Sequence, residues 1–319
     1  MKKALITGVT GQDGSLIAKY LLSNGYLVFG LHRTKSNISN LFDILDDPNL
    51  KLIQGDLMNE DLMKYILTNH RFDEIYNLAS QSNIRLSYEE PVSTFKVTLL
   101  GTVMLMDLVK KHSPKSKVFQ AGSSSMFGNS ADSDGLQRES TPFRPVSPYA
   151  SSKLFAHNIC TNYRENEGIF VVNGILYNHE SPMDKRSPGI IKTIANKAVM
   201  IKKGIIDDFF IPNLNISIDF GHAQDYIKAM WLTLQQEKST DYIIASGEPY
   251  SIEYICEYIF NKLDLEYKKY IKTNQSLNSE FVSKGDASKI RNLGWSKNYN
   301  FNQLLDEIVE FENKNLINV

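Results

Sequence analysis

Cysteine is scarce in this sequence, with only Cys160 and Cys256 among 319 residues. Both lie in segments of helical pattern, and neither has the spacing of a metal-ligand set or a redox motif. This scarcity excludes a disulfide-stapled secreted scaffold and predicts a reducing, cytoplasmic setting with both thiols in the core. A charge excess is also absent, because 35 Lys and Arg residues balance 36 Asp and Glu residues. We therefore expect no nucleic-acid partner and no anionic membrane partner.

Long apolar runs are missing as well. The apolar stretch after Lys3 ends at Thr7 and Gly8, far short of a signal peptide's hydrophobic region, and no run approaches the length of a membrane span. Repeats and low-complexity tracts do not occur. His157, His179 and His222 lack ligand spacing with carboxylates or thiols, so the sequence predicts no metal site. With 42% hydrophobic residues, the chain is long enough for one large domain or two smaller ones.

Apolar segments of strand length alternate with helical periodicity through the first half of the chain. The predicted strands are 4–7, 27–31, 51–53, 74–78, 118–121 and 169–176, and the predicted helices are 15–23, 61–68, 92–111 and 148–164. Buried strands separated by helices predict an α/β fold with a doubly wound parallel sheet, the Rossmann arrangement.

A glycine-rich loop follows the first predicted strand and precedes a predicted helix. It contains Gly8, Gly11 and Gly14, with Gln12 and Asp13 between them. Glycines permit a tight turn and a close approach of the backbone, and the helix N-terminus offers free amides and a positive dipole to a pyrophosphate. Glycine-rich turns are common, but this position in the chain favours a dinucleotide site.

The residues after the second predicted strand leave the choice of dinucleotide open. An acid there would hold the ribose hydroxyls of NAD, but the segment from Gly30 to Lys35 has none. Arg33 and Lys35 suit the 2′-phosphate of NADP, whereas Arg33 would equally suit stacking on adenine, and both are also ordinary solvated loop cations.

The second half of the chain is less regular. Proline- and glycine-containing loops surround an amphipathic helix near 190–201, and the segment 219–235 is expected to return to the first domain. We predict a dinucleotide-binding domain of residues 1–177 with 218–246, and a smaller α/β substrate-binding domain of residues 178–217 with 247–319.

Tyr149 and Lys153 form the most informative pair in the sequence. Four residues apart on a predicted helix, they share one face, so the Lys153 ammonium can favour the Tyr149 phenolate. That makes a phenol with a reference pKa of about 10 usable as a base near neutral pH. A serine shelf, Ser123 to Ser125, lies upstream and supplies hydroxyls. Together with the glycine-rich loop, the pair predicts hydride transfer.

Further motifs extend along nearly the whole chain, at 6–14, 55–57, 74–79, 81–82, 147–150, 162–165, 173–176, 178–182, 221–223 and 293–295. Together they resemble the extended short-chain dehydrogenases/reductases, and more narrowly the GDP-mannose 4,6-dehydratases. The resemblance implies a GDP-sugar substrate between two domains and a homodimer or homotetramer. It implies cofactor contacts from Asp56, Leu57, Leu78 and Ala79, and substrate contacts from Gln81, Ser82, Asn178 and Lys192. Asp56 and Asn178 are also residue types that commonly cap turns.

Two departures from the dehydratase pattern change the expected chemistry. Ser125 stands where the dehydratases carry the glutamate that moves the C5 proton, and a serine hydroxyl is too weak a base for that step. Ser123 remains able to orient the 4-hydroxyl for Tyr149. Met183 and Asp184 replace an arginine pair on the substrate side, where Lys185, Arg186 and Lys192 could compensate.

These residues lead to one favoured hypothesis and several alternatives. We expect a C4 dehydrogenase that converts a GDP-linked mannose-type hexose or heptose to its 4-keto sugar for surface polysaccharide, with Tyr149 as base and Lys153 binding the ribose. A suspected resemblance to the GDP-manno-heptose 4-dehydrogenases shifts the expected cofactor slightly from NADP to NAD. The alternatives are a 4,6-dehydratase, a 4-keto reductase, a C4 epimerase, and a non-catalytic dinucleotide sensor.

Overall fold

A seven-stranded parallel sheet forms the centre of the larger domain, in the order β10-β6-β5-β4-β1-β2-β3. The computed structural model describes residues 1–184, 189–274 and 281–315. The strands are β1 (Lys3–Thr7), β2 (Leu27–His32), β3 (Leu50–Gln54), β4 (Glu74–Asn77), β5 (Lys117–Ala121), β6 (Val171–Leu176) and β10 (Tyr242–Ile244). The predicted doubly wound Rossmann sheet is therefore confirmed.

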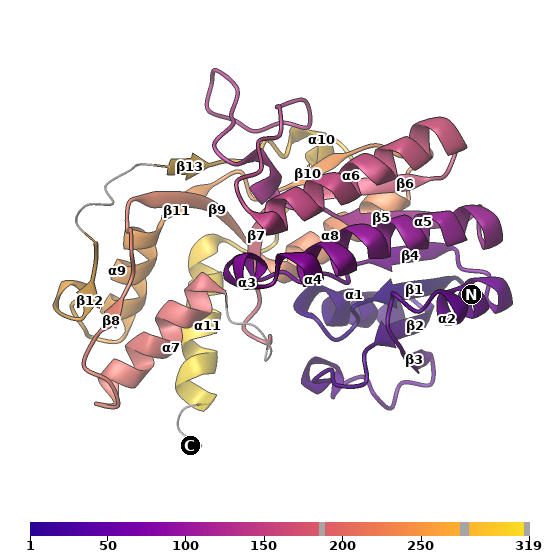
Figure 1. Ribbon diagram of the computed structural model, residues 1–319. Coiled ribbons are helices and arrows are strands. Elements are labelled where there is room, and N and C mark those ends of the chain that lie inside the picture. Colours follow the sequence, from indigo (N-terminus) through magenta and orange to yellow (C-terminus); the bar gives the residue numbers. More distant parts are fainter. Residues whose placement is uncertain (185–188, 275–280, 316–319) are drawn as a thin grey trace.

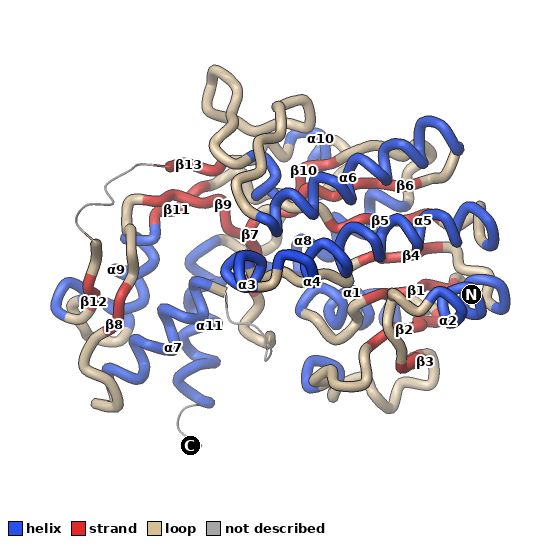
Figure 2. Tube along the Cα trace, in the orientation of Figure 1, coloured by secondary structure: helices blue, strands red, loops and turns tan. Residues whose placement is uncertain are grey.

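Helices cover both faces of this sheet, as Figures 1 and 2 show. Ala4 and Ile6 of β1 pack with α1 (Gln12–Ser23) and α8 (Ala223–Leu234), whereas Leu5 joins the opposite core cluster with α2 (Glu60–Asn69) and α5 (Gly101–His112). The third helix on that second face is α6 (Pro148–Glu167), which packs against α5. Alternate residues of each strand thus fill two apolar layers, which explains why the strands read as continuous hydrophobic runs.

The smaller domain is built around β9 (Ile216–His222). This strand pairs with β7 (Asn178–Glu180), β11 (Pro249–Ser251) and β13 (Phe281–Ser283), and β8 (Phe209–Phe210) pairs with β12 (Ile271–Lys272). One core cluster joins the sheet to α7 (Ile190–Lys202), α9 (Ile252–Lys262) and α11 (Phe301–Asn315). Other short helices are η1 (Ser39–Leu41), α3 (Ile84–Glu89), η3 (Ser124–Phe127), η4 (Tyr267–Lys269) and α10 (Ser288–Arg291).

The C-terminal part crosses back to the large sheet once more than the sequence predicts. The sequence predicts residues 218–222 in the larger domain and the residues around α10 in the smaller one. Instead, 218–222 belong to β9 of the smaller sheet, and Ala287, Ile290 and Trp295 belong to the core cluster of α1 and α8. Lys289 also donates to the carbonyl of Asp241, 2.8 Å away, just before β10. Taken alone, the residue pattern of this short segment is like that of the helices on either side of it in the chain. Only its packing shows that it belongs to the larger domain.

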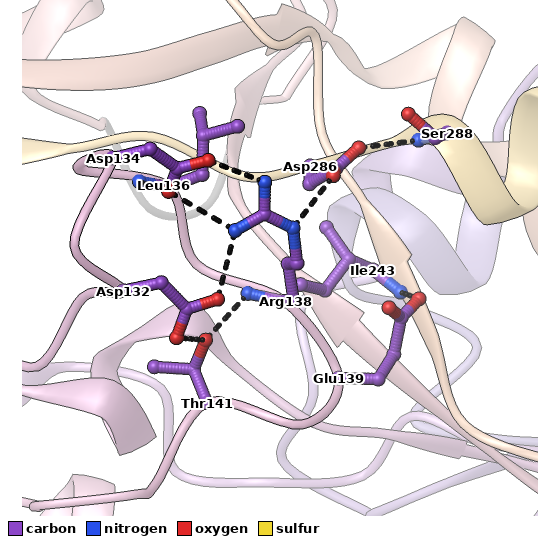
Figure 3. A network of polar contacts seen from close by, with 9 residues as sticks. All are labelled: Asp132, Asp134, Leu136, Arg138, Glu139, Thr141, Ile243, Asp286 and Ser288. Carbon is purple, nitrogen blue, oxygen red and sulfur yellow. Dashed lines mark hydrogen bonds and ion pairs between the residues drawn. The ribbon is translucent and has the colours of Figure 1, made fainter.

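The loop between η3 and α6 is tied to the same C-terminal segment (Figure 3). Arg138 forms ion pairs with Asp132 at 2.8 Å, Asp134 at 2.6 Å and Asp286 at 3.1 Å. Glu139 accepts a 2.9 Å hydrogen bond from the Ile243 amide of β10. The loop that leaves the serine shelf is therefore held by two distant parts of the chain.

One long helical segment, Pro91–His112, meets the length and hydropathy of a membrane span, contrary to the expectation that no run approaches it. It consists of α4 (Pro91–Phe95), the π-helical turn η2 (Lys96–Leu100) and α5. In the structure α5 packs between α2 and α6, and α4 packs on α6. These contacts bury 44% of the apolar window, while Val92 and Leu100 stay exposed. Core helices of other folds meet the same test, so length and composition are weak evidence for a span.

Candidate active site

A cavity of about 700 Å³ lies at the carboxyl ends of the parallel strands, where open α/β sheets bind their ligands. Residues from both domains line it. Of the predicted site residues, the lining contains Gly8, Gly11, Gln12, Asp13, Gly14, Arg33, Asp56, Leu57, Leu78, Ala79, Gln81, Ser82, Ser123, Tyr149, Lys153 and Asn178. Among the described residues, Ser125 and Lys192 are predicted site residues that this lining does not include.

The glycine-rich loop has little room for side chains. Gly8 has φ of +71°, and a β-carbon there would lie 3.0 Å from the backbone of Ala79. A β-carbon at Gly14 would lie 2.2 Å from the Gly8 carbonyl oxygen. Gly11 is the N-cap of α1, and within the described chain no side chain caps this helix. The loop therefore leaves its first-turn amides for an anionic group, and the residues fit a dinucleotide pyrophosphate.

Tyr149 and Lys153 are positioned by the start of α6. Ser147 caps this helix by accepting a 3.1 Å hydrogen bond from the Ala150 amide, and Pro148 occupies its first turn. The side chains of Tyr149 and Lys153 are both buried and both line the cavity. The Lys153 ammonium donates to the Ala121 carbonyl at 2.8 Å, at the end of β5.

The electrostatics of this pair differ from the expectation. Burial lowers the pKa of Lys153 to about 8, although the charge of Asp13 partly opposes this. Burial raises the pKa of Tyr149, while a hydrogen bond with Ser123 lowers it and the charge of Asp13 adds to the increase. The prediction that Lys153 brings the Tyr149 pKa down towards neutral is thus not met, because burial outweighs the Lys153 ammonium, which lies over the Tyr149 ring at 5.9 Å from its centroid and donates to Ala121.

The serine shelf begins η3 directly after β5. Ser123 caps this turn by accepting from the Ser125 amide at 3.2 Å, and the two hydroxyl oxygens lie 2.8 Å apart. Ser123 faces Tyr149 across the cavity lining, whereas the Ser125 hydroxyl is directed to Ser123. The Ser123 hydroxyl is therefore available to a ligand, and the Ser125 hydroxyl holds Ser123 in place.

Most carboxylates around the cavity already have partners. Asp56 accepts from the Met58 amide at 2.9 Å, so it caps a turn while it lines the cavity. Glu180 accepts from two amides at the start of α7, and Asp184 accepts from Asn40 at 2.9 Å. Among the described lining residues, Glu90 is a carboxylate for which the structure shows no side-chain hydrogen bond or ion pair. Sequence reasoning missed Glu90, whose only signal is its place before Pro91 at a helix start.

Lys192 is expected from the sequence to contact the substrate, but it does not line the cavity. It is buried, and its ammonium donates to the carbonyls of Pro182 and Asp184, with the Glu312 carboxylate 3.7 Å away. Lys192 therefore holds the loop that follows β7. Lys185 and Arg186 lie outside the described residues.

One end of the cavity is lined by His32, Arg33 and Ser36 after β2, and by Asp56 after β3. Ser36 donates its amide to the Arg33 carbonyl at 2.9 Å, which curls the segment into a turn. A cation and a hydroxyl thus stand at the position that decides between NAD and NADP.

Three histidines have acidic partners, and both cysteines are buried thiols. His157, His179 and His222 lie within 3.4 Å, 2.9 Å and 3.2 Å of Asp241, Asp13 and Glu307, respectively. Across the described ranges, no three His, Cys, Asp or Glu side chains form a metal-binding group. Cys160 and Cys256 are buried, and burial raises the pKa of both thiols, that of Cys256 to about 12.

Comparisons with known proteins agree with this geometry. The family model described as GDP-mannose 4,6 dehydratase matches residues 5–308. The chain is 40% identical to GDP-mannose 4,6 dehydratase 2 of Arabidopsis thaliana, covering 97% of this chain and 86% of that protein. It is 38% identical to the GDP-mannose 4,6-dehydratase of Vibrio cholerae serotype O1, covering 90% and 76%.

Solved structures show the same fold at lower identity. A dTDP-glucose 4,6-dehydratase from Bacillus anthracis in complex with NAD superposes with a TM-score of 0.87 at 24% identity, covering 99% of this chain and 97% of that one. RMD from Pseudomonas aeruginosa, complexed with NADPH, superposes with a TM-score of 0.82 at 20% identity, covering 99% and 100%. The fold is thus that of enzymes that bind nicotinamide dinucleotides.

Proposed function

This chain belongs to the GDP-mannose 4,6-dehydratase family of extended short-chain dehydrogenases/reductases, and from that membership we propose that it oxidises C4 of a GDP-linked mannose-type sugar. The observation that carries the proposal is the convergence of Ser123, Tyr149 and Lys153 on the cavity beside the glycine-rich loop. Gly8, Gly11 and Gly14 would hold a nicotinamide dinucleotide, which supplies the hydride acceptor when bound.

The protein's own residues divide the remaining work. Ser123 donates or accepts a hydrogen bond at the substrate 4-hydroxyl and orients it, and the Tyr149 phenolate removes its proton. Lys153 supplies positive charge beside them, and we propose that it also holds the ribose. Because burial raises the Tyr149 pKa, the phenolate needs this cationic surrounding to form.

We propose that the reaction stops at the 4-keto sugar. Ser125 offers only a hydroxyl, bound to Ser123, where C5 deprotonation requires a carboxylate. Loss of a general base typically costs about 10²- to 10⁴-fold in rate, enough to separate oxidation from dehydration. A return of hydride to C4 would make the enzyme a 4-keto reductase or a C4 epimerase, which the stereochemistry of the product distinguishes.

Complete 4,6-dehydration is the second candidate, and the comparisons favour it because the curated relatives carry that name. In the structure, Glu90 supports it, since this exposed carboxylate lines the cavity and is available as a substitute base. If dehydration occurs, Glu90→Gln should abolish it and leave C4 oxidation intact.

One experiment separates the two candidates. Purified protein is incubated with GDP-mannose and dinucleotide in deuterated water, and products are followed by ¹H NMR and by absorbance of the reduced cofactor. A dehydrogenase gives stoichiometric reduced cofactor and a 4-keto sugar with its C5 proton retained. A dehydratase exchanges the C5 proton, forms a C6 methyl group and returns the hydride. If neither product forms from GDP-mannose or from GDP-manno-heptose, both candidates are refuted.

For the cofactor, Arg33 and Ser36 support NADP over NAD, because a cation and a hydroxyl line the place of the 2′-phosphate. This reverses the slight sequence-based preference for NAD, which depended on the heptose resemblance. The sugar itself is proposed as a hexose or heptose of manno type, from the family membership. Because Met183 and Asp184 stand where the dehydratases carry an arginine pair, the contacts to the sugar diphosphate differ and the sugar need not be mannose. Parallel assays with GDP-mannose and GDP-manno-heptose test this choice.

A homo-oligomer is proposed from an exposed apolar face on α3, α4 and α6. Tyr88, Val92 and Phe155 are 60%, 79% and 53% exposed, and α3 and α4 both pack against α6. Large apolar side chains gathered on one face favour association. Light scattering should show a dimer or tetramer that Val92→Asp dissociates, whereas Tyr65→Asp on α2 should not. A monomeric wild-type protein would refute the oligomer.

A further inference from the structure

The first two residues of α1 reach from the glycine-rich loop to β7, the strand that carries Asn178. The Gln12 side-chain amide donates to the His179 carbonyl at 3.1 Å and accepts from the Ser181 amide at 2.9 Å, as a neighbouring strand would. The Asp13 carboxylate lies 2.9 Å from Nε2 of His179. Residues far apart in the chain thus connect the cofactor loop of one domain to the substrate strand of the other.

The contacts of His179 require a proton on both ring nitrogens. Its Nδ1 lies 2.6 Å from the Tyr177 carbonyl oxygen, which can only accept, and its Nε2 faces the Asp13 carboxylate. Both nitrogens must therefore donate, so the ring is an imidazolium. His222 gives the contrast: its Nδ1 accepts from the Gln224 amide at 3.2 Å and cannot carry a proton.

The surroundings of His179 stabilise a charged ring. Its side chain is 9% exposed, and the ring stacks on Tyr226 with centroids 4.4 Å apart. Burial lowers the pKa of His179, but the charge and hydrogen bond of Asp13 and the Tyr177 carbonyl raise it above the usual 6.5, with a smaller contribution from Glu180. The other charged groups nearby are Lys153, which interacts with Asp13, and His222.

We propose that His179 is a positioning residue held as an imidazolium, and that Gln12, Asp13 and His179 form a clasp coupling the dinucleotide loop to the sugar-nucleotide site at Asn178. A dinucleotide on α1 fixes the first turn of this helix, including Gln12 and Asp13. Through the clasp, the bound dinucleotide also orders β7. The binding of the sugar nucleotide then no longer includes the entropic cost of ordering that strand. The coupling is reciprocal, since each ligand changes the affinity of the other by the same factor. The ligand class comes from the proposed function, but the clasp itself does not require turnover.

The protonation state can be measured in the unliganded wild-type protein. In a long-range ¹H–¹⁵N spectrum of ¹⁵N-histidine-labelled protein at pH 7, His179 should show two protonated-type nitrogens. His222 should show one protonated and one unprotonated nitrogen, which makes it an internal control. Assignment follows from the signals lost in His179→Gln and His222→Gln. A neutral pattern for His179 would overturn the imidazolium.

The coupling is tested by calorimetric binding of GDP-mannose with and without saturating NADPH, which avoids turnover. We expect NADPH to tighten GDP-mannose binding about 10-fold in the wild type, within the usual range of site coupling. The tightening should fall below about 2-fold in His179→Gln and in Asp13→Asn. His222→Gln should retain it, and circular dichroism melts should verify that each variant is folded.

The outcomes separate the clasp from the proposed reaction. Equal GDP-mannose affinity with and without NADPH in the wild type overturns the clasp, whatever the variants do. Full coupling in a folded His179→Gln protein also overturns it. If coupling is present and depends on His179 while no 4-keto product forms from GDP-mannose, the clasp stands and the proposed reaction fails.

Discussion

Replacing Ser125 by glutamate should give the serine shelf the acid–base group that dehydration needs. The Ser125 hydroxyl oxygen lies 2.8 Å from that of Ser123, and Ser123 is hydrogen-bonded to Tyr149. A carboxylate at this position therefore stands next to the groups that oxidise C4. We expect Ser125→Glu to accelerate C5 proton exchange and formation of a 6-deoxy-4-keto sugar by about 10²- to 10⁴-fold over the wild type.

The opposing cost is smaller than this gain. The substitution removes the hydrogen bond between Ser125 and Ser123, which is worth about 1 kcal/mol. A rate gain of 10²- to 10⁴-fold corresponds to about 3 to 5 kcal/mol of activation free energy. Even if the whole hydrogen-bond contribution were lost from the activation barrier, the rate would fall only about 5-fold, so the gain prevails. The buried Lys153, with a pKa of about 8, is mostly charged at pH 7 and favours an added carboxylate nearby.

The assay follows ¹H NMR of GDP-mannose turnover in deuterated water. Loss of the C5 proton signal and appearance of a C6 methyl signal report dehydration. The matched control is Ser125→Gln, which has nearly the same shape without a carboxylate and should gain nothing. The reasoning is refuted if the wild type already exchanges C5 as fast as Ser125→Glu, because another group then serves as the base.

Three further predictions address the rest of the site. Tyr149→Phe should lower 4-keto sugar formation about 10²- to 10⁴-fold while calorimetric GDP-mannose affinity stays within 2-fold, about the error of such titrations; unchanged turnover would remove the phenolate from the mechanism. Arg33→Ala should weaken NADP binding about 10-fold and NAD binding less, by fluorescence titration, since charge-assisted hydrogen bonds contribute about 1.5 to 3 kcal/mol; equal losses would argue against a 2′-phosphate contact. The His179 pKa is raised, so its contribution to stability is complete below pH 6.5 and is lost as pH rises through the folded pKa. The Asp13 pKa is lowered, so its contribution is present above pH 3.8 and is lost as pH falls through the folded pKa. The difference in melting temperature between wild type and Asp13→Asn should therefore be greatest between these values and shrink at alkaline pH; a pH-independent difference would contradict the ion pair.

Much of the site was predictable because its requirements are local. A side chain at Gly14 would clash with the backbone of its own loop, and Gly8 has the positive φ that glycine favours. Tyr149 and Lys153 share a helix face through their spacing alone, and a capped helix start at Ser147 positions both. The parallel sheet likewise follows from alternating buried strands and helices.

Only the tertiary structure decided which distant groups meet. The sequence separates Asp13 and His179 by 166 residues, and nothing in either local pattern indicates that they pair. Lys192 has the residue type of a phosphate ligand, yet its ammonium on α7 is buried against backbone carbonyls of the loop that follows β7. The physical reason is that spacing fixes directions within one helix or strand, whereas contacts between elements depend on how the sheet order and the second domain bring their ends together.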